Sequence, residues 1–424
     1  MRNNTPPTSP YQNDDEEEEF IYVGDDIDEV IENLEEIPDN DESGDTSEDD
    51  DWEMDHLGRR NRVVAERDDS IMTFSMHTKA IFCGSLNPDG TLAVTGGEDD
   101  KAYVWKVDTG EVVFAVTDYT DSVIAAEFSH DGTFLATGDM CGEMKVFRVD
   151  KEYKKVWEFS MGDMSWMKWH KKSHVLLAGT EVGDIYIWKI PSGQCKVIGG
   201  NGFKSEVAVF TSDEKRLAAG YGDGSFKLWD IKNQQAILTI EPESDNTYDE
   251  RRDNFPLAIT TLDTDNDNQL IITGSENGRV NLINNSGIIG RLSELSPNSG
   301  SDAYEGSIEK VLIDCPGLEF KVAITASLNG RILIWDVAHQ SIRNEIIDND
   351  DRTGITSLVW GKNQSFIAGT LGGQIKSWNV RNGERKFTLL GHTDHIYDLS
   401  YHEGRNIILT VSEDNTAKIF NVPV

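Results

Sequence analysis

The residues best suited to catalysis are histidines and acidic side chains near the C-terminal end of the sequence. His392 and Asp414 supply an imidazole and a carboxylate of the kind used in hydrolytic relays, and His395 and His402 add two imidazoles nearby. These histidines form neither an HExxH motif nor another zinc-ligand spacing that includes a carboxylate. The glycines of TLGGQ and GGEDD lack the lysine and the helix of a phosphate-binding loop. The sequence therefore predicts no catalytic residue, no metal site and no cofactor.

The four cysteines are scattered along the chain with no CxxC pair. They predict neither a zinc site nor a disulfide framework, and reduced thiols are typical of the cytosol and the nucleus. The N-terminus is polar and acidic without an apolar signal region, and about 18 consecutive apolar residues occur nowhere. We therefore expect a cytoplasmic protein, with the nucleus as a second location.

The chain is strongly acidic, with 39 basic and 76 acidic side chains and a formal net charge of -37. Such a charge repels the phosphates of nucleic acids and the anionic surface of a membrane. We expect no direct nucleic-acid partner and no membrane partner. A basic protein is the natural partner for this charge.

Residues 1–56 contain 23 acidic residues against one basic residue, Arg2, so their net charge is -22 and -15 remains for residues 57–424. Such a segment buries too little apolar area to fold alone, and we predict an acidic disordered tail over residues 1–69 and a folded domain over 70–424. The apolar spacing over 25–37 predicts a short amphipathic helix that ends before Pro38. This helix is either a docking element or a transient helix in a solvating tail.

One pattern recurs from residue 70 onward. Each copy has a short apolar strand, a turn rich in Asp, Asn or Gly, a second strand, a second turn and alternating residues that close on an aromatic or apolar side chain; TLAVTGGEDDKAYVWKV and KVAITASLNGRILIWDV are clear copies. The closing positions are Trp105, Phe147, Trp188, Trp229, Ile283, Trp335, Trp378 and Phe420. They are 41 to 43 residues apart except for intervals of 54 and 52, which hold polar insertions. This period is typical of propeller blades.

Eight copies of four short strands cover their apolar residues only by packing on neighbouring copies, so the copies must close into a ring. The strand from Ile71 to Met76 precedes the first copy, and we expect it to be the outer strand of the last blade. The predicted fold is all-β, a single eight-bladed propeller preceded by the disordered tail. A closed ring has no free edges, so we expect a monomer.

The repeats resemble WD40 repeats, whose hydrogen-bonding network is found in two of the blades. The resemblance implies a structural network of His77, Thr95, Asp99 and Trp105 in the first blade and of His392, Thr410 and Asp414 in the last. Because this network already explains the pair of His392 and Asp414, that pair needs no catalytic role. Most other blades lack the Gly-His pair or the turn Asp and must be held by packing.

Longer blocks resemble the family of the angio-associated migratory cell protein: AVTGGEDDKAYVW, FSHDGTFLATGDMCGEMKVF, and DMSWMKWH followed by VLLAGT. The resemblance covers the whole propeller, whereas the acidic leader matches only in its acidity. It implies a non-catalytic chaperone like the family's fungal ribosome-assembly factors, which capture the basic N-terminal segment of a newly made large-subunit ribosomal protein on an acidic propeller face. Two alternatives stay open: an escort of histones or other basic proteins, and a WD40 adaptor in signalling or ubiquitin ligation.

One end of such a propeller carries the turns between the second and third strands and the loops that enter the innermost strands. The eight positions at or beside the turn Asp are Glu98, Met140, Glu181, Gly222, Glu276, Leu328, Leu371 and Glu413, four of them Glu and none basic. Carboxylates around a concave mouth focus negative potential. The predicted protein-binding residues are Glu98, Asp100, Asp121, Asp139, Asp163, Trp166, Glu181, Tyr221, Glu276, Asp398 and Glu413.

Turns also favour Asp for backbone reasons, so Asp99, Asp223 and Asp414 are interpreted as structural. Exposed ion pairs contribute roughly 0.2 to 1 kcal/mol each, whereas nanomolar affinity requires about 12 kcal/mol. The carboxylates would therefore steer and select a Lys/Arg-rich segment, and apolar anchors such as Trp166 and Tyr221 would supply the remaining affinity.

Overall fold

The structure, a computed structural model, describes residues 67–242, 258–292, 307–347 and 354–423. Most of the predicted acidic tail, including the helix expected over 25–37, lies outside these residues. The chain divides into two units, residues 1–60 and 61–424, and the description below concerns the second. Among the described residues, no helix has the length and apolar character needed to cross a bilayer.

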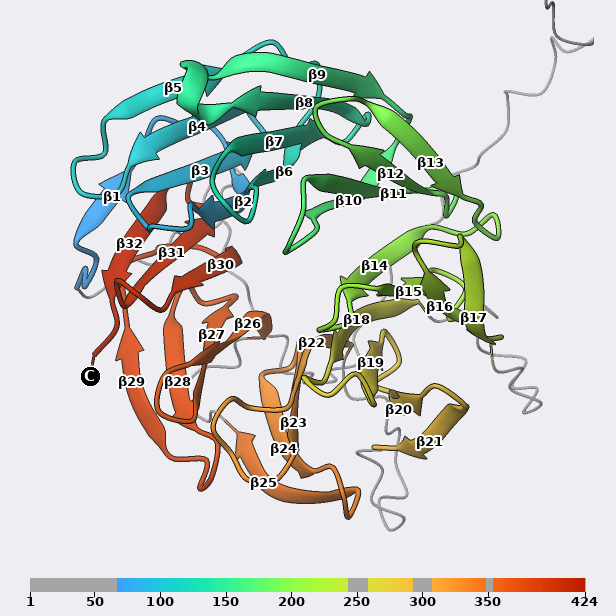
Figure 1. Ribbon diagram of the computed structural model, residues 1–424. Helices are drawn as coiled ribbons and strands as arrows, with labels where there is room; N and C mark the ends of the chain where they lie inside the picture. Colours follow the sequence, from blue (N-terminus) through green and yellow to red (C-terminus); the bar gives the residue numbers. More distant parts are fainter. Residues whose placement is uncertain (1–66, 243–257, 293–306, 348–353, 424) are drawn as a thin grey trace, which may run out of the picture. The chain divides into compact units, whose positions relative to one another are not determined.

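The second unit is a ring of eight antiparallel sheets with four strands each, as predicted (Figure 1). The first two blades are β2 (Ile81–Leu86), β3 (Leu92–Gly97), β4 (Lys101–Lys106) and β5 (Val112–Val116), then β6 (Val123–Phe128), β7 (Phe134–Asp139), β8 (Glu143–Arg148) and β9 (Lys154–Ser160). A 3-10 turn, η1 (Val149–Lys151), lies between β8 and β9. The third and fourth blades are β10 (Met164–Trp169), β11 (Val175–Thr180), β12 (Ile185–Lys189) and β13 (Gln194–Ile198), then β14 (Ser205–Phe210), β15 (Arg216–Tyr221), β16 (Phe226–Asp230) and β17 (Gln235–Ile240).

The remaining blades repeat this arrangement. The fifth and sixth are β18 (Ile259–Thr264), β19 (Ile271–Ser275), β20 (Val280–Asn284) and β21 (Gly287–Arg291), then β22 (Ile308–Ile313), β23 (Val322–Ser327), β24 (Arg331–Asp336) and β25 (Ser341–Ile347). The seventh and eighth are β26 (Ile355–Gly361), β27 (Ser365–Thr370), β28 (Ile375–Asn379) and β29 (Arg385–Leu389), then β30 (Ile396–His402), β31 (Ile407–Ser412), β32 (Ala417–Asn421) and β1 (Met72–Phe74).

The ring is closed by strands from both ends of the domain. β1 pairs antiparallel with β32, with Met72 opposite Ile419 and Phe74 opposite Ala417, as the sequence predicts. The Lys418 ammonium also donates a hydrogen bond of 2.6 Å to Asp68. Closure in this way gives the last blade a full set of four strands and pairs the outer edge of β32.

The core lies between successive blades. The eight closing positions predicted from the sequence all fall in the third strand of a blade, and none is more than 8% exposed. Trp105, for example, stacks on Phe74 with ring centroids 4.7 Å apart. Because each sheet is covered on both faces by its neighbours, the apolar pattern that sequence reasoning detected is satisfied only in the complete ring.

Each innermost strand carries a bulge immediately after its first residue, so eight equivalent bulges surround the centre of the ring. A bulge inserts one extra residue and changes the direction of its side chain. The bulge residues are Phe82, Ile124, Ser165, Glu206, Thr260, Glu309, Thr356 and Tyr397, and none of them is buried, although the strand residue before each one is. The bulges thus present a ring of accessible side chains at one end of the innermost strands.

Candidate protein-binding face

Two kinds of connection lie at the same end of the ring because the strands of each blade are antiparallel. They are the turns between the second and third strands and the loops that lead into the innermost strands. We call the described part of these connections, together with the bulge residues, the candidate face. Besides the bulge residues, its ranges are 75–80, 98–100, 117–122, 140–142, 161–163, 181–184, 199–204, 222–225, 241–242, 258, 276–279, 292, 307, 328–330, 354, 371–374, 390–395 and 413–416.

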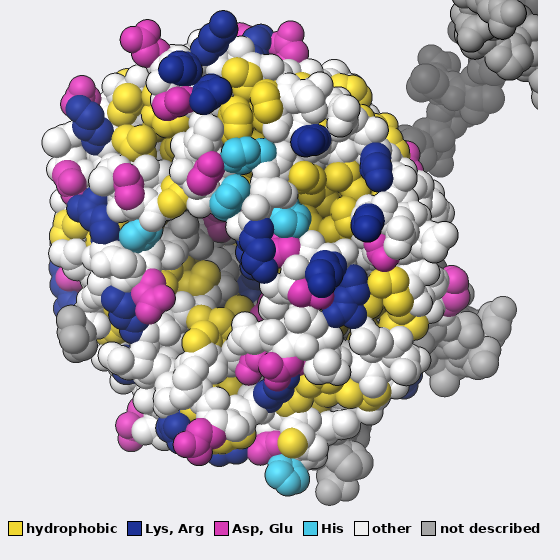
Figure 2. All heavy atoms as spheres, in the orientation of Figure 1, with side chains coloured by type: hydrophobic (Ala, Val, Ile, Leu, Met, Phe, Trp, Pro, Cys, Tyr) yellow, Lys and Arg dark blue, Asp and Glu magenta, His cyan; other side chains and the backbone are white. Residues whose placement is uncertain are grey.

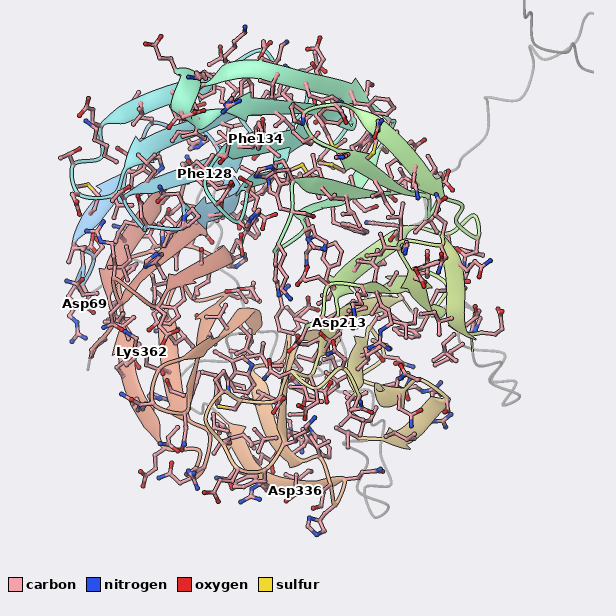
Figure 3. The ribbon with its side chains drawn as sticks, in the orientation of Figure 1. Asp69, Phe128, Phe134, Asp213, Asp336 and Lys362 are labelled. Atoms are coloured by element: carbon pink, nitrogen blue, oxygen red, sulfur yellow. The ribbon has the colours of Figure 1, made fainter. Side chains whose placement is uncertain are left out.

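The remaining turns form the opposite face; Asp213 and Lys362 belong to these turns, and Asp336 ends β24 beside one of them (Figure 3). Figure 2 looks onto this face, where basic and acidic side chains are interspersed and histidine side chains gather over the blades of β6 to β13. The ring is hollowed at its centre in the same view.

One backbone hydrogen bond recurs in all eight blades of the candidate face. A turn residue donates its N–H to the carbonyl just before the innermost strand of the same blade, at 2.8 to 3.1 Å. The donors are Glu98, Met140, Glu181, Gly222, Glu276, Leu328, Leu371 and Glu413, and the acceptors are Ala80, Ser122, Asp163, Lys204, Ala258, Ser307, Gly354 and His395. The eight positions that the sequence singled out are therefore structurally equivalent and lie beside the start of the innermost strands.

Two of the four glutamates at these positions are paired with lysines of the candidate face itself. The Lys79 ammonium lies 3.4 Å from Glu98, and the Lys204 ammonium lies 3.3 Å from both Glu181 and Glu206. Burial alone would lower the pKa of Lys204, but Glu206 and Glu181 stabilise its charge and raise that pKa. The acidity of the face is thus partly neutralised from within, which the spacing of turn residues did not indicate.

The other predicted carboxylates of this face have varied surroundings. Asp163 and Glu276 are exposed, and Asp100 is partly exposed with a left-handed φ of 60°. Asp121 accepts hydrogen bonds from the Ser122 N–H at 2.7 Å and the Cys141 thiol at 3.1 Å, which lower its pKa. These four carboxylates are accessible to a cationic ligand.

Glu413 belongs to a polar cluster in the last blade. It accepts a hydrogen bond of 3.2 Å from the Tyr397 hydroxyl and lies 3.0 Å from Nδ1 of His395. Tyr397 is a bulge residue, so this cluster joins the turn to the ring of accessible side chains. Glu413 is partly exposed.

The two aromatic residues predicted as anchors are buried. Trp166 is 9% exposed, packs against Gly179 and donates a hydrogen bond of 3.0 Å from Nε1 to the Ser205 hydroxyl of the next blade. Tyr221 has no exposed area, and its hydroxyl accepts a hydrogen bond of 3.2 Å from Trp229. Burial raises the pKa of Tyr221 to about 12. Both side chains stabilise packing and offer little or no surface to a partner.

Two predicted carboxylates are held by backbone hydrogen bonds of the fold. Asp139 is fully buried at the end of β7, where its Oδ1 accepts a hydrogen bond of 2.8 Å from the Glu143 N–H. Asp398 accepts hydrogen bonds from its neighbour Leu399 at 2.8 Å and from the Gly84 N–H of the first blade at 3.3 Å. Burial raises the pKa of both carboxyls. Asp398 therefore links the innermost strands of the last and first blades.

The His–Asp–Thr network is present in the first and last blades. His77 lies 2.8 Å from Asp99 and 3.0 Å from Thr95, and His392 lies 2.8 Å from both Asp414 and Thr410. Trp105 is in place, but its Nε1 has no hydrogen-bond partner among the described residues, so the chain of hydrogen bonds ends at Thr95. The histidines and carboxylates have almost no exposed side-chain area. This geometry explains the His392–Asp414 pair as part of the fold.

Exposed apolar side chains on the candidate face were missed by sequence reasoning. Fourteen large hydrophobic residues are at least 36% exposed among those described, and eight of these lie on or next to outer strands. The other six are all on the candidate face, namely Met76, Met140, Val182, Phe203, Leu328 and Tyr397. None of the fourteen is on the described turns of the opposite face. The only signal in the sequence was their position beside turn residues.

Three of the bulge residues extend this apolar character along one arc of the ring. Phe82 and Tyr397 meet edge to face with ring centroids 5.6 Å apart, and Ile124 occupies the bulge of the next blade. Glu206 and Glu309 occupy bulges on the other side of the ring. The bulge residues of the candidate face are therefore apolar or aromatic in the eighth, first and second blades and acidic in the fourth and sixth.

The fold and the repeated turn define a WD-repeat propeller with a candidate protein-binding face. Consistent with this class, the family model described as WD domain, G-beta repeat matches residues 68–106, 110–148, 195–230 and 383–421. The angio-associated migratory cell proteins of Pongo abelii and Homo sapiens are 35% and 34% identical to the chain over 367 residues, which is 84% of the chain and 80% of each relative. The chain belongs to the family of the angio-associated migratory cell protein.

A fungal protein is also similar over most of its length. Ribosome assembly protein SQT1 of Saccharomyces cerevisiae is 25% identical over 406 residues, covering 88% of the chain and 92% of that protein. Its crystal structure gives a TM-score of 0.72 at 21% identity, covering 84% of the chain and all of that structure. Sqt1 of Chaetomium thermophilum, solved bound to the N-terminus of the ribosomal protein L10, gives 0.71 at 18% identity with the same coverage. At these identities the structures show a shared fold alone.

Proposed function

We propose that the protein is a non-catalytic chaperone that captures a Lys/Arg-rich segment of a newly made large-subunit ribosomal protein on the candidate face. The observation that carries the proposal is the combination of exposed carboxylates and exposed apolar side chains on this face, with no large exposed apolar side chain on the described turns of the opposite one. The similarity to SQT1 supports a role in ribosome assembly, and the L10 complex of the Chaetomium protein supports a ribosomal-protein segment as cargo.

The same proposal assigns a location and an assembly state. Ribosomal proteins are made in the cytoplasm and enter the nucleus, so we place the protein in the cytoplasm and also in the nucleus. The closed ring leaves no sheet edge that needs a second copy, and we propose that the chaperone acts as a monomer. Its net charge of -37 argues against direct contact with nucleic acid or a membrane.

The two chemistries of the face have separate tasks. Exposed ion pairs contribute roughly 0.2 to 1 kcal/mol each, so carboxylates such as Glu276 attract and select a basic segment but hold it weakly. Apolar side chains such as Phe203 and Val182 supply area that a bound segment covers. Binding should weaken with salt without disappearing.

The lysines of the face give it a further selective property. Lys79 and Lys204 already occupy the position that a cationic side chain of the cargo would take beside Glu98 and Glu181. A cargo lysine or arginine must displace these two lysines from the glutamates. An isolated cation gains little binding free energy by replacing one ion pair with another. A segment that engages apolar and acidic positions together gains more, so the face favours extended basic segments over single charges.

The experiment is affinity purification of the wild-type protein beside a charge-reversed variant, both checked for folding by circular dichroism. The variant changes the four glutamates at equivalent turn positions to lysine: Glu98→Lys, Glu181→Lys, Glu276→Lys and Glu413→Lys. A matched control carries the same change in charge at exposed residues of the opposite face: Glu111→Lys, Glu152→Lys, Glu319→Lys and Glu403→Lys.

We expect one basic large-subunit ribosomal protein to be enriched with the wild type and with the control, and to be lost from the variant. If both variants lose the protein equally, net charge alone explains binding and the candidate face is wrong. If a ribosomal protein is never enriched, or the partners are acidic, the chaperone function is wrong and an adaptor role takes its place.

A further inference from the structure

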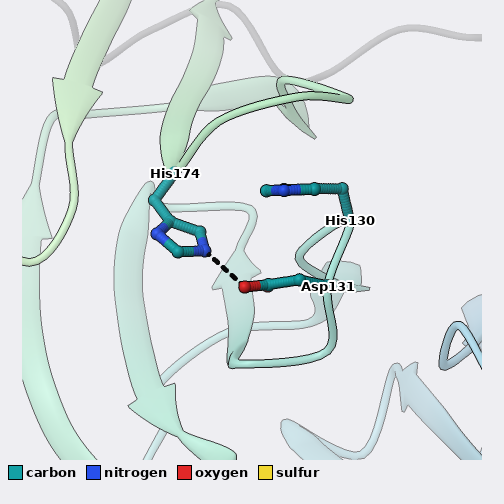
Figure 4. Close-up of side chains that lie close together, drawn as sticks. All are labelled: His130, Asp131 and His174. Carbon is teal, nitrogen blue, oxygen red and sulfur yellow. Dashed lines mark hydrogen bonds and ion pairs between the residues drawn. The ribbon is translucent and has the colours of Figure 1, made fainter.

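Three metal-ligating side chains meet on the opposite face, where two blades adjoin. His130 and Asp131 belong to the turn between β6 and β7, and His174 directly precedes β11 (Figure 4). One ligand atom from each of these three residues lies within 4.8 Å of the others. The two histidine rings are 5.3 Å apart between centroids, and Nε2 of His174 lies 2.9 Å from Asp131.

The carboxylate and one imidazole are held in place by their surroundings. Asp131 accepts hydrogen bonds from the Thr133 N–H at 3.0 Å, the Thr133 hydroxyl at 2.7 Å and the Ser129 hydroxyl at 2.8 Å. These hydrogen bonds and the contact with His174 fix the orientation of the Asp131 side chain, although it is exposed. The rings of Phe134 and His174 meet edge to face, with their centroids 4.8 Å apart. Supporting hydrogen bonds of this kind are what orient ligands in metal sites.

His130 is the adaptable member of the cluster. It is exposed, and its ring makes no hydrogen bond to another described residue. The ligand atoms of a tetrahedral zinc ion are about 3.3 Å apart when metal–nitrogen distances are about 2.0 Å. Because His130 is exposed, we expect a rotation of its side chain to close the remaining separation.

Two other acidic clusters of the described residues are poorer candidates. The cluster of Asp265, Asp267 and Asp314 already contains a cation, because Lys321 contacts Asp265 and lies 2.9 Å from Asp267. The cluster of Asp394, His395 and Glu413 has a single imidazole and lies on the candidate face. Only the first group combines two imidazoles with a preorganised carboxylate.

We propose that His130, Asp131 and His174 bind a divalent transition-metal ion of the zinc class. Two imidazoles and one carboxylate are a ligand set for zinc, nickel or copper and not for magnesium or calcium, which take oxygen ligands. The ion links the turns of the second and third blades and leaves a coordination position open to water or a partner side chain. This inference departs from the sequence-based expectation of no metal site, and it is independent of the proposed chaperone function.

The test is calorimetric titration of the full-length protein with zinc in excess magnesium, which saturates sites made only of carboxylates, including any in the acidic tail. We expect one tight zinc site in the wild type. His130→Ala and His174→Ala should each weaken it at least tenfold, and Thr133→Val, which removes a supporting hydroxyl, should weaken it about tenfold. His339→Ala, which alters an exposed histidine elsewhere on the opposite face, should leave it unchanged.

Thermal unfolding gives a second readout, because an ion that binds the folded state raises its midpoint. Zinc should raise the midpoint of the wild type and of His339→Ala, and should have a smaller effect on His130→Ala. Since the ring of His130 makes no hydrogen bond to a described residue, this variant should fold normally even if His174→Ala does not. The proposal would be overturned if the wild type and His130→Ala bind zinc with equal affinity. It would also be overturned if, in excess magnesium, the wild type binds no more zinc than His130→Ala does.

Discussion

The contribution of the apolar anchors can be measured at Phe203, which lies in the loop entering the fourth blade. The exposed fraction of Phe203 is 46%. Burial of a whole aromatic side chain removes about 150 to 250 Å² from water, so a partner that covers Phe203 removes about 90 Å². At about 25 cal/mol per Å² this area is worth about 2 kcal/mol, or about thirtyfold in Kd. Phe203→Ala should therefore weaken cargo binding by about ten- to thirtyfold.

The assay is fluorescence anisotropy with a labelled basic peptide from the ribosomal protein recovered by affinity purification. The control is Ile237→Ala, because Ile237 has the same exposure, 47%, but lies on the outer strand β17. The loss caused by Phe203→Ala should persist at high salt, since area burial is not screened as charge is. An unchanged Kd for Phe203→Ala, or an equal loss for Ile237→Ala, would refute the assignment of apolar anchors to the candidate face.

Three further predictions concern single contacts. His392 and neighbouring donors lower the pKa of Asp414 from 3.8 to about 2, although burial alone would raise it. Ionised Asp414 should therefore stabilise the fold by about 2 kcal/mol above pH 4, and this contribution should be lost as the pH falls toward 2. Urea unfolding of Asp414→Asn and wild type should thus differ at pH 7 and converge in acid. Lys204→Met should free Glu181 and Glu206 and accelerate cargo association about two- to fivefold at low salt, measured by stopped flow; an unchanged rate would contradict the displacement argument. The hydrogen bond to Asp121 raises the pKa of Cys141 to about 11, so Asp121→Asn should speed alkylation of that thiol at pH 8, read by mass spectrometry against Cys195 as an internal reference.

The fold was predictable because its signal is periodic. Closing positions about 42 residues apart, such as Trp105 and Phe147, identify one strand of each blade, and the other three follow from the alternation between turns. The outer strand β1 was also predictable, since a strand before the first blade has no other place in a closed ring. These inferences depend on patterns that many residues share, so one atypical residue, such as Ile283, does not disturb them.

The accessible side chains were harder to predict because exposure depends on local geometry. Trp166 and Tyr221 are large aromatics near the correct end of the ring, but the backbone turns both into the packing between or within blades. Phe203 is exposed because it lies in the loop and not in the strand that follows it. A bulge determines which side chain of an innermost strand is accessible, and the residue types in these strands do not predict where the bulge occurs. The pairing of Lys204 with Glu181 similarly requires two loops from neighbouring blades.

Under the proposed chaperone function, the repeated turn would allow one fold to specify one cargo. Its hydrogen bond uses only backbone atoms, so all eight blades keep the same geometry whatever side chain stands at the donor position. The first, third, fifth and eighth blades place Glu there, whereas the second, sixth and seventh place Met140, Leu328 and Leu371. A symmetric ring with one residue type would bind a basic segment equally well in eight rotated positions. The unequal distribution of charge and apolar area removes this degeneracy, and the face should therefore hold an extended segment in a single register.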